Sequence, residues 1–195
     1  MFVHTRRALL AALIAATLAG CGKDEATDPL AYVPADTPYV FANRNPTSKA
    51  VVDAWLNMYG VSIEQIYTDM ANDPEMQKIE GEFGEWVRAA LPEIGKLASV
   101  GGMEQIGMKA EGRFAIYGYG LLPVYRMELV DAAKFGEAVK RVEGRAGKQL
   151  ATRKVGEHTL WQFGNDKATV VFGPMGNFLV ATVLPAKADE ARVTA

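Results

Sequence analysis

The sequence predicts an α+β fold, in which a helical N-terminal layer is followed by a mostly antiparallel sheet with a crossover helix. Apolar residues recur at helical spacing from about residue 45 to residue 100, whereas apolar and polar residues alternate from about residue 112 to residue 185. The turns between the alternating segments are short, and short turns join antiparallel strands. We therefore expect one α+β domain over residues 37–195, with helices on one face of the sheet.

A short strand and a first helix open the expected domain. Pro38 precedes the apolar residues 39–42, and a proline at that place favours the start of a strand or an edge strand. Asn45 and Pro46 then have the order of an N-cap followed by proline in the first helical turn. We expect this helix to end at Gly60. Its apolar face consists of Val51, Val52, Trp55, Leu56 and Tyr59.

Two further helices complete the expected helical layer. Ser62 and Gln65 have the spacing of a capping box, which predicts a second helix. Asp73 and Pro74 open a third, and Pro92 should kink or end it because proline lacks the backbone donor that a helix interior needs. The apolar stripe expected to face the core consists of Met76, Ile79, Phe83, Trp86, Val87, Ala90 and Leu91.

A hairpin is predicted where the spacing changes. Phe114 and Ile116 would share one face of the first strand, and a turn is expected at residues 118–120. In the second strand Arg126 and Glu128 alternate with apolar residues. Such alternation predicts a hairpin with one face in water.

A crossover helix and three more strands follow. Asp131 has the position of a helix cap, and we expect the helix to end at Gly144. Strands are predicted at residues 158–163, 168–172 and 178–184. The inner face of the helix would hold Phe135, Val139 and Val142, and the turns between the strands would lie at residues 164–166 and 173–176.

The first two dozen residues have the pattern of an export signal. Two arginines precede an apolar run over residues 8–19, and the run leads through Leu18, Ala19 and Gly20 to Cys21. About a dozen apolar residues are too few to cross a bilayer, which needs about twenty. The four residues at the end of the run resemble the lipobox of a bacterial lipoprotein.

This resemblance implies a processed and anchored protein. Residues 1–20 would be a signal peptide, a peptidase would cut between Gly20 and Cys21, and a diacylglyceryl group would be attached to the Cys21 thiol. Residues 21–36 would be the lipidated cysteine and a tether. In Gram-negative lipoproteins, Gly22 in place of aspartate implies the periplasmic face of the outer membrane. Two alternatives stay open: an ordinary signal peptide cut after a small residue, or a short buried helix.

Lipidation would also leave the mature protein without a free thiol and would make the membrane its main partner. Cys21 is the only cysteine in the sequence, so lipidation leaves no thiol for a disulfide or a metal. Two acyl chains, at about 0.8 kcal/mol per buried methylene, hold a protein on its membrane. Cleavage would remove two of the 21 basic residues and none of the 23 acidic ones, and the basic residues are dispersed. We therefore expect the membrane as partner and no nucleic acid.

Two short segments carry a second, looser resemblance. Residues 32–42 and residues 114–124 resemble an uncharacterised family of proteobacterial envelope lipoproteins. The resemblance implies a periplasmic lipoprotein and carries no activity and no site residues. Those proteins are longer, and here residues 187–193, after Leu184 and Pro185, have the pattern of the start of a helix that the chain ends within about two turns. Both points suggest a chain truncated at its C-terminus; a frayed terminal tail is the alternative.

The candidate catalytic patterns all have simpler explanations. After cleavage, His158 is the only histidine, and it is expected to be an ordinary residue of a strand. Residues 144–149 share two residues with a phosphate-binding loop but have the place of a helix end. Glu80, Glu82 and Glu85 lie close together, on the expected solvent face of a helix. Three serines, Ser48, Ser62 and Ser99, lie in none of the usual motifs of a serine nucleophile. Five methionines are expected to pack in the core in preference to lining a binding surface: Met58, Met70, Met76, Met103 and Met108.

These observations together predict a lipid-anchored periplasmic envelope protein with a non-enzymatic binding or structural role. We expect no catalytic residue, no cofactor and no metal, and a partner that is an envelope protein, an envelope polymer or a lipid. Two alternatives stay open. One is a small hydrolase that uses carboxylates, and the other is a fragment of a longer lipoprotein.

Overall fold

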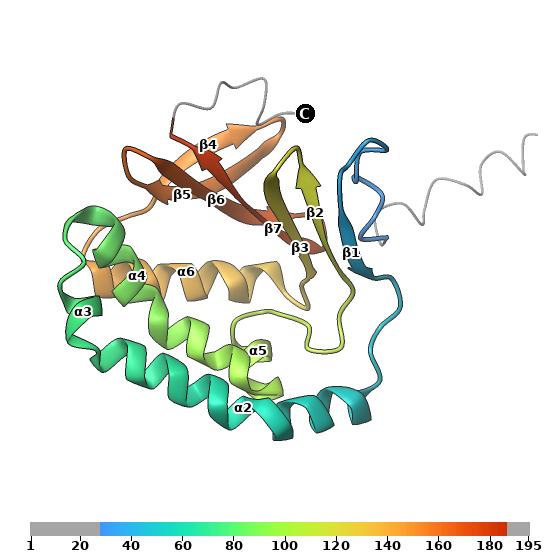
Figure 1. The fold of residues 1–195 in the computed structure, drawn as a ribbon, viewed down its shortest axis with the longest axis horizontal. Coiled ribbons are helices and arrows are strands. Elements are labelled where there is room, and N and C mark those ends of the chain that lie inside the picture. The colour runs from blue at the N-terminus through green and yellow to red at the C-terminus, as the bar shows by residue number, and fades with distance from the viewer. Residues whose placement is uncertain (1–27, 187–195) are drawn as a thin grey trace, which may run out of the picture.

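The computed structural model describes residues 28–186, in which all strands belong to one sheet (Figure 1). All neighbouring strands are antiparallel, in the order β1-β2-β3-β7-β6-β5-β4. The expected α+β class is thus confirmed. The strands are β1 Val40–Asn43, β2 Phe114–Tyr119, β3 Leu122–Glu128, β4 Ala151–Val155, β5 His158–Gly164, β6 Ala168–Met175 and β7 Phe178–Pro185. The helices are α2 Lys49–Asn72, α3 Pro74–Gln77, α4 Gly81–Ile94, the 3₁₀ helix η2 Gly95–Ala98, α5 Val100–Gln105 and α6 Ala132–Ala146.

The sheet is built from two antiparallel units that meet in its centre. β1, β2 and β3 pair in sequence, and α6 then carries the chain from β3 to β4 at the far edge. β4 to β7 return strand by strand until β7 pairs with β3, which places Arg126 opposite Val180. α6 is therefore the expected crossover helix.

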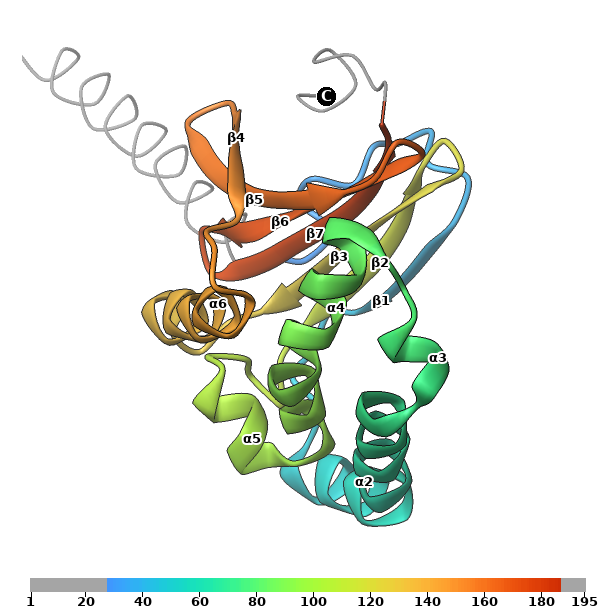
Figure 2. The ribbon, with the colours of Figure 1, turned by 90° about the vertical axis from the view of Figure 1, so that its left-hand side faces the viewer.

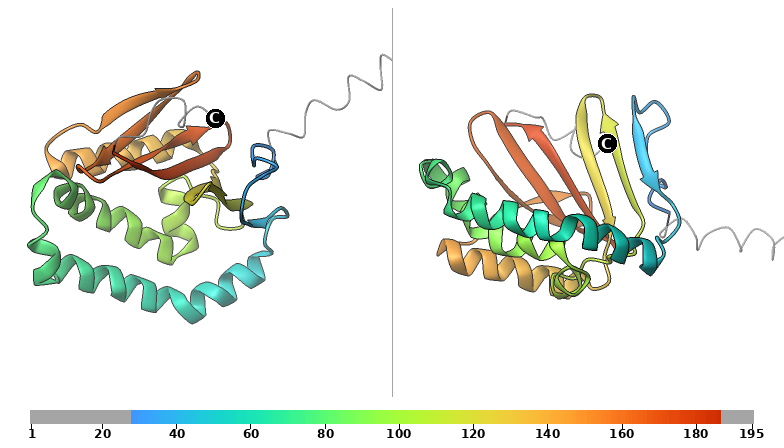
Figure 3. Two further views of the ribbon diagram at one scale, coloured as in Figure 1. Left: turned by 45° about the horizontal axis from the view of Figure 1, so that its top comes forward. Right: turned by 60° about the horizontal axis from the view of Figure 1, so that its bottom comes forward.

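The labelled helices lie on one side of the sheet (Figures 1 and 2). The left view of Figure 3 looks onto the strands, and the right view looks onto α2, α4 and α6. Between α4, α6 and the sheet, Trp86, Val139 and Leu150 form a buried cluster against the rings of Trp161 and Phe172. Within residues 28–186, no helix covers the opposite face of the sheet.

The ends of α6 follow from two local signals. The Asp131 carboxylate accepts hydrogen bonds from the backbone N–H groups of Ala133 at 2.8 Å and Lys134 at 3.2 Å, as an N-cap does. Gly147 ends the helix in the left-handed conformation, with φ of 69°. The expected end at Gly144 is too early, because a glycine inside a helix costs only about 1 kcal/mol and keeps its backbone donor.

The helical layer differs from the prediction in its breaks. The first two expected helices form a single helix, α2, which continues through Gly60 and Ser62. As in α6, a glycine inside the helix keeps its backbone donor and costs only about 1 kcal/mol. The third expected helix is instead divided into α3 and α4, and α4 begins at Gly81 with φ of 78°. Pro92 lies inside α4, which continues to Ile94 and then tightens into η2.

The sheet contains one strand that the prediction lacks. β4 includes Arg153 and Lys154 and forms the outer edge, where charged residues are usual and the alternation of polar and apolar residues is weak. β4 pairs with β5 over its whole length, from Ala151 opposite Gln162 to Val155 opposite His158.

Two hairpin turns lie at the last residue of the ranges predicted for them, 118–120 and 173–176. The first is at Gly120 and the last is at Gly176, both with φ of 60°. Gly173 and Pro174, expected in the last turn, belong to β6. Proline is tolerated there because the pairing of β6 with β5 ends at Phe172, beyond which β5 needs no donor from β6.

The prediction of a wet face on the first hairpin is wrong. Arg126 and Glu128 are only 4% and 6% exposed, whereas Tyr125 on the other face is 37% exposed. The chain itself covers the charged face, because Tyr32 lies over Arg126 and Lys109 and Arg113 lie against Glu128.

The described part of the expected tether packs against the domain. Pro29 is buried, the Asp28 carboxylate pairs with Arg44, and Tyr32 lies over Arg126. Residues 28–32, within the described part of the segment expected to be a tether, thus contact the domain. The expected signal peptide over residues 1–20, the cleavage site at Gly20 and Cys21, and the short helix after Leu184 lie outside the described residues. No helix between residues 28 and 186 is long and apolar enough to cross a membrane.

Candidate ligand-binding groove

The sheet face opposite the helices carries a groove of about 430 Å³. Its floor is a cluster of Leu160, Val171 and Leu184, which are each at most 4% exposed although no helix in residues 28–186 covers them. The apolar side chains of the groove are Pro34, Leu122, Val124, Val155, Leu160, Val171, Met175, Val180 and Leu184. The polar ones are Tyr32, Tyr117, Tyr119, Arg126, His158 and Thr182.

The register of the central strands places these side chains on one face. Residues directly opposite each other in neighbouring strands share a face of the sheet. Tyr117 of β2 lies opposite Val124 of β3, which in turn lies opposite Thr182 of β7. Arg126, two residues along β3, shares this face with Val180. The groove is therefore centred on the β3–β7 pair, where the two halves of the sheet meet.

Arg126 is the most unusual residue of the groove. Its guanidinium lies between two aromatic rings, 4.4 Å from the ring centre of Tyr32 and 4.8 Å from that of Phe178. Among the side chains that the structure describes, its Nε is the one buried nitrogen or oxygen that has no hydrogen-bond partner. An unsatisfied buried polar atom costs about 1–3 kcal/mol, and more where the group is charged. Such an atom in a groove marks a place where a ligand can bind.

The pKa values around Arg126 reflect its desolvation. Burial lowers the pKa of the Arg126 guanidinium, and the nearby tyrosines Tyr117 and Tyr32 oppose this effect. Burial also raises the pKa of Tyr117, against its charge interaction and hydrogen bond with Arg126. Arginine stays protonated under all physiological conditions. The groove therefore contains a permanent positive charge in an apolar environment.

None of the described residues that line the groove carries a carboxylate to neutralise this charge. The nearest acidic residue along β3, Glu128, is fully engaged elsewhere. Arg113 donates to it from Nε at 3.0 Å, from Nη2 at 2.9 Å and from its backbone N–H at 2.9 Å. Lys109 donates from Nζ at 2.8 Å. The first of these contacts, the Arg113 side chain, does most to lower the pKa of Glu128 to about 2.

The other polar groups of the groove lie along its walls. The Thr182 hydroxyl donates to the carbonyl oxygen of Pro123 at 2.9 Å, which fixes its orientation. His158, expected to be an ordinary strand residue, is the exposed first residue of β5 and lines the groove. The groove thus offers hydroxyl groups, one imidazole and one guanidinium. These are groups that bind and orient a ligand.

Two other hollows lack such an unused polar group. One, of about 310 Å³, lies between the helices and the sheet and is lined by apolar residues apart from Glu93. Glu93 is bonded to Arg141, Lys96 and Arg145. Burial opposes ionisation of Glu93, but these three cations outweigh it and lower its pKa to about 2.

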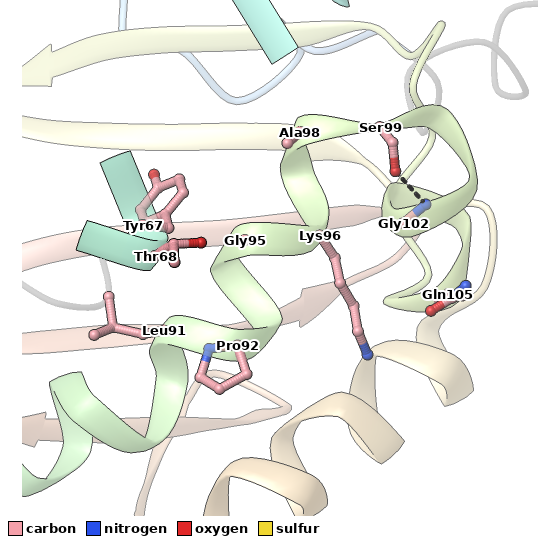
Figure 4. Close-up of a pocket in the computed structure, with 10 residues that line it drawn as sticks. All are labelled: Tyr67, Thr68, Leu91, Pro92, Gly95, Lys96, Ala98, Ser99, Gly102 and Gln105. Carbon is pink, nitrogen blue, oxygen red and sulfur yellow. Dashed lines mark hydrogen bonds between the residues drawn. The ribbon is translucent and has the colours of Figure 1, made fainter. Parts of the chain in front are cut away.

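The second hollow, of about 490 Å³, lies between α2, η2 and α5 (Figure 4). In Figure 4 the Ser99 side chain points at the backbone N–H of Gly102, from which it accepts the capping bond of α5 at 3.1 Å. Lys96 donates to Glu93 at 2.8 Å. Both groups thus serve the fold, and this hollow has no buried, unsatisfied charge comparable with Arg126.

Glu80, Glu82 and Glu85 lie on the surface of the helical layer. Glu85 bonds to Lys148 at 2.6 Å, and Glu82 lies 3.5 Å from the same Lys148 Nζ. Glu82 also accepts a hydrogen bond from the Trp86 ring nitrogen. All three glutamates are exposed on α4 or just before it, as expected for a solvated helix surface.

Several of the remaining sequence candidates have structural roles. Ser48 and Ser99 are N-caps of α2 and α5, and Gly147 ends α6, so the segment that shares residues with a phosphate loop is a helix end as predicted. Met108 is buried and Met103 packs in the same cluster, but Met58 is 68% exposed. Core packing is therefore confirmed for Met103 and Met108 and wrong for Met58.

Sequence reasoning missed Arg126, Tyr117 and Tyr32 as site residues. Arg126 has the spacing of a solvent-facing strand residue, and only the pairing of β3 between β2 and β7 shows that it is buried. A usable signal was present in composition: both faces of β3 carry apolar residues, Val124 on one and Met127 on the other. A charged residue in a strand with two apolar faces indicates a central strand.

The described residues contain no group of three or more histidine, cysteine or acidic side chains that could hold a metal ion. Comparisons with known proteins give the groove no precedent: no protein-family model, no curated protein and no solved structure matches the chain. The chemistry of the groove is therefore argued from its own residues.

Proposed function

We propose that the protein is a lipid-anchored, non-enzymatic binding protein of the bacterial cell envelope, attached through Cys21 to the periplasmic face of the outer membrane, whose groove holds a small ligand. The groove carries the proposal. A cavity of several hundred Å³ with an apolar floor and a few fixed polar groups is the usual form of a small-molecule site. Of the expected partners, a lipid fits this volume better than a protein surface or a polymer.

The lipobox resemblance and the packing of the N-terminal segment support the location. Residues 22–27 separate the proposed lipid from Asp28, whose carboxylate pairs with Arg44 of the domain. At no more than about 3.6 Å per residue, this segment keeps Asp28 within roughly 25 Å of the bilayer surface. The groove would therefore lie close to the membrane and could exchange ligands with it.

The anchoring part is tested by expressing the full chain with its own leader beside Cys21→Ala. We expect the wild-type chain to incorporate radiolabelled palmitate and to sediment with outer-membrane vesicles, and the variant to incorporate none. Equal labelling, or recovery of both chains in the soluble fraction, would contradict lipid anchoring.

The binding part is tested by placing a photoreactive residue in the living cell at Leu122, which lines the groove, or at Leu121, its exposed neighbour in the hairpin turn. We expect irradiation to attach a small molecule, seen as a mass increase of the tryptic peptide, at Leu122 and not at Leu121. The same yield at both positions would indicate random capture and no binding site.

A further inference from the structure

We propose that the ligand is a long-chain fatty acid, whose carboxylate binds Arg126 and whose chain lies along the floor of the groove. This inference rests on the proposed function, because it names the ligand class of the same groove. Three observations carry it: an uncompensated cation, a head-group site that suits one negative charge, and an apolar path that leads away from that site.

The first observation is that the chain gives Arg126 no counter-ion within residues 28–186. Arg113 and Lys109 share Glu128, and Lys96, Arg141 and Arg145 share Glu93, so other buried charges are neutralised with hydrogen bonds. The Arg126 guanidinium has only the faces of two rings and a hydrogen bond with Tyr117, and its Nε lacks a partner. A bound anion would satisfy both its charge and its free donor.

The second observation concerns the charge of the head group. A guanidinium presents parallel N–H donors that match the two oxygens of a carboxylate. Of the groove residues that the structure describes, Arg126 alone is an arginine or lysine, and one positive charge neutralises one carboxylate. A phosphate monoester would bring nearly two negative charges into an apolar site. A neutral alcohol would leave the guanidinium uncompensated.

The third observation is the path for an apolar chain. From Arg126, the same face of β3 presents Val124 and then Leu122. At about 3.4 Å per residue, Leu122 lies roughly 14 Å along the strand from Arg126. Leu160 and Leu184 complete the floor beside this row. An extended acyl chain could thus bury its methylenes while its carboxylate stays on Arg126.

The test uses the full lipoprotein, reconstituted in phosphatidylcholine vesicles with three photoreactive C16 probes that differ only in the head group: carboxylate, alcohol and phosphate. Labelled peptides are mapped by mass spectrometry after irradiation. We expect the carboxylate probe to label peptides of β3 and β7 about tenfold or more above the alcohol, which is the effect of one charge-assisted hydrogen bond.

Variants separate charge from shape. Arg126→Met keeps a long apolar side chain, and we expect it to lose the preference for the carboxylate probe while still taking up the alcohol. Arg126→Lys should keep part of the preference, because it retains the charge and loses the fork. Lys154→Met removes one positive charge from exposed β4 and should change nothing.

The outcomes distinguish this inference from the proposed function. If no probe labels the groove strands, or if all label α4 and α6 beside the apolar core hollow, the groove is not the binding site and both proposals fail. If alcohol and carboxylate label equally, or phosphate labels most, the groove binds a ligand but the fatty-acid assignment is wrong. A last outcome is that the carboxylate probe hardly labels the wild-type chain but labels a variant that carries both Asp189→Asn and Glu190→Gln. In that case the partner of Arg126 is the chain's own C-terminal segment, and the fatty-acid assignment is wrong.

Discussion

Glu128 and Arg126 lie two residues apart on β3, on the same face and almost equally buried, yet the chain treats them differently. Glu128 receives four hydrogen bonds from Arg113 and Lys109. Arg126 receives no acidic partner from the described residues, and one of its donors is unused. The comparison separates two kinds of buried charge: Glu128 ties β3 to the segment before β2, whereas Arg126 keeps an unused donor at a cost in stability.

The largest expected effect comes from removing the compensated charges by acid. In the folded protein the pKa values of Glu93 and Glu128 are about 2, below the ordinary value of 4.5. Groups with lowered pKa values stabilise the fold above the ordinary value, and this contribution is lost as the pH falls. We expect the urea midpoint of unfolding to decline steeply between pH 4.5 and pH 2. A flat profile over that range would show that the two clusters do not stabilise the fold.

The next effect isolates the compensated member of the pair. Glu128→Gln should destabilise the protein by about 2 kcal/mol at pH 7, since it leaves Lys109 and Arg113 near a neutral amide. This loss of stability is smaller than the about 3–5 kcal/mol expected when one partner of a fully buried ion pair is removed, because both cations are partly exposed to water. Urea unfolding measures the change. Asp53→Asn, which breaks the exposed pair with Lys49, is the control and should leave the midpoint unchanged.

The smallest effect has the opposite sign. Arg126→Met should stabilise the ligand-free protein by about 1 kcal/mol, because it replaces an uncompensated buried cation by an apolar side chain that still packs on Tyr32 and Phe178. Thermal unfolding without added ligand measures it. If the variant were instead less stable by the amount expected for Glu128→Gln, Arg126 would have a partner in the folded chain and the contrast would be lost.

The parts of the fold that could be predicted are those with local causes. Asp131 marks the start of α6, and the change of spacing near residue 112 marks the start of the sheet. β4 was missed because Arg153 and Lys154 give an edge strand the composition of a loop. The break expected at Gly60 was wrong because packing of α2 against η2 and α4 outweighs the propensity of one glycine.

The groove could not be predicted because its cause is non-local. The burial of Arg126 depends on Tyr32 from before β1 and on Phe178 from β7, which lie far from it in sequence. Alternation along β3 gives two faces but does not say which face the helices will cover. That choice is made when α6 crosses the sheet and β7 pairs with β3.

The central β3–β7 pair also has a consequence for the order of folding. It joins residues that are separated by α6 and three strands, so closing this loop carries a large entropic cost and contacts of this kind slow folding. Until β7 pairs with β3, β3 is an edge strand and Arg126 faces water. The part of the groove that β5, β6 and β7 supply is then missing. The groove is therefore complete only once β7 has paired with β3, and a chain interrupted before Phe178 would present an open edge prone to aggregation.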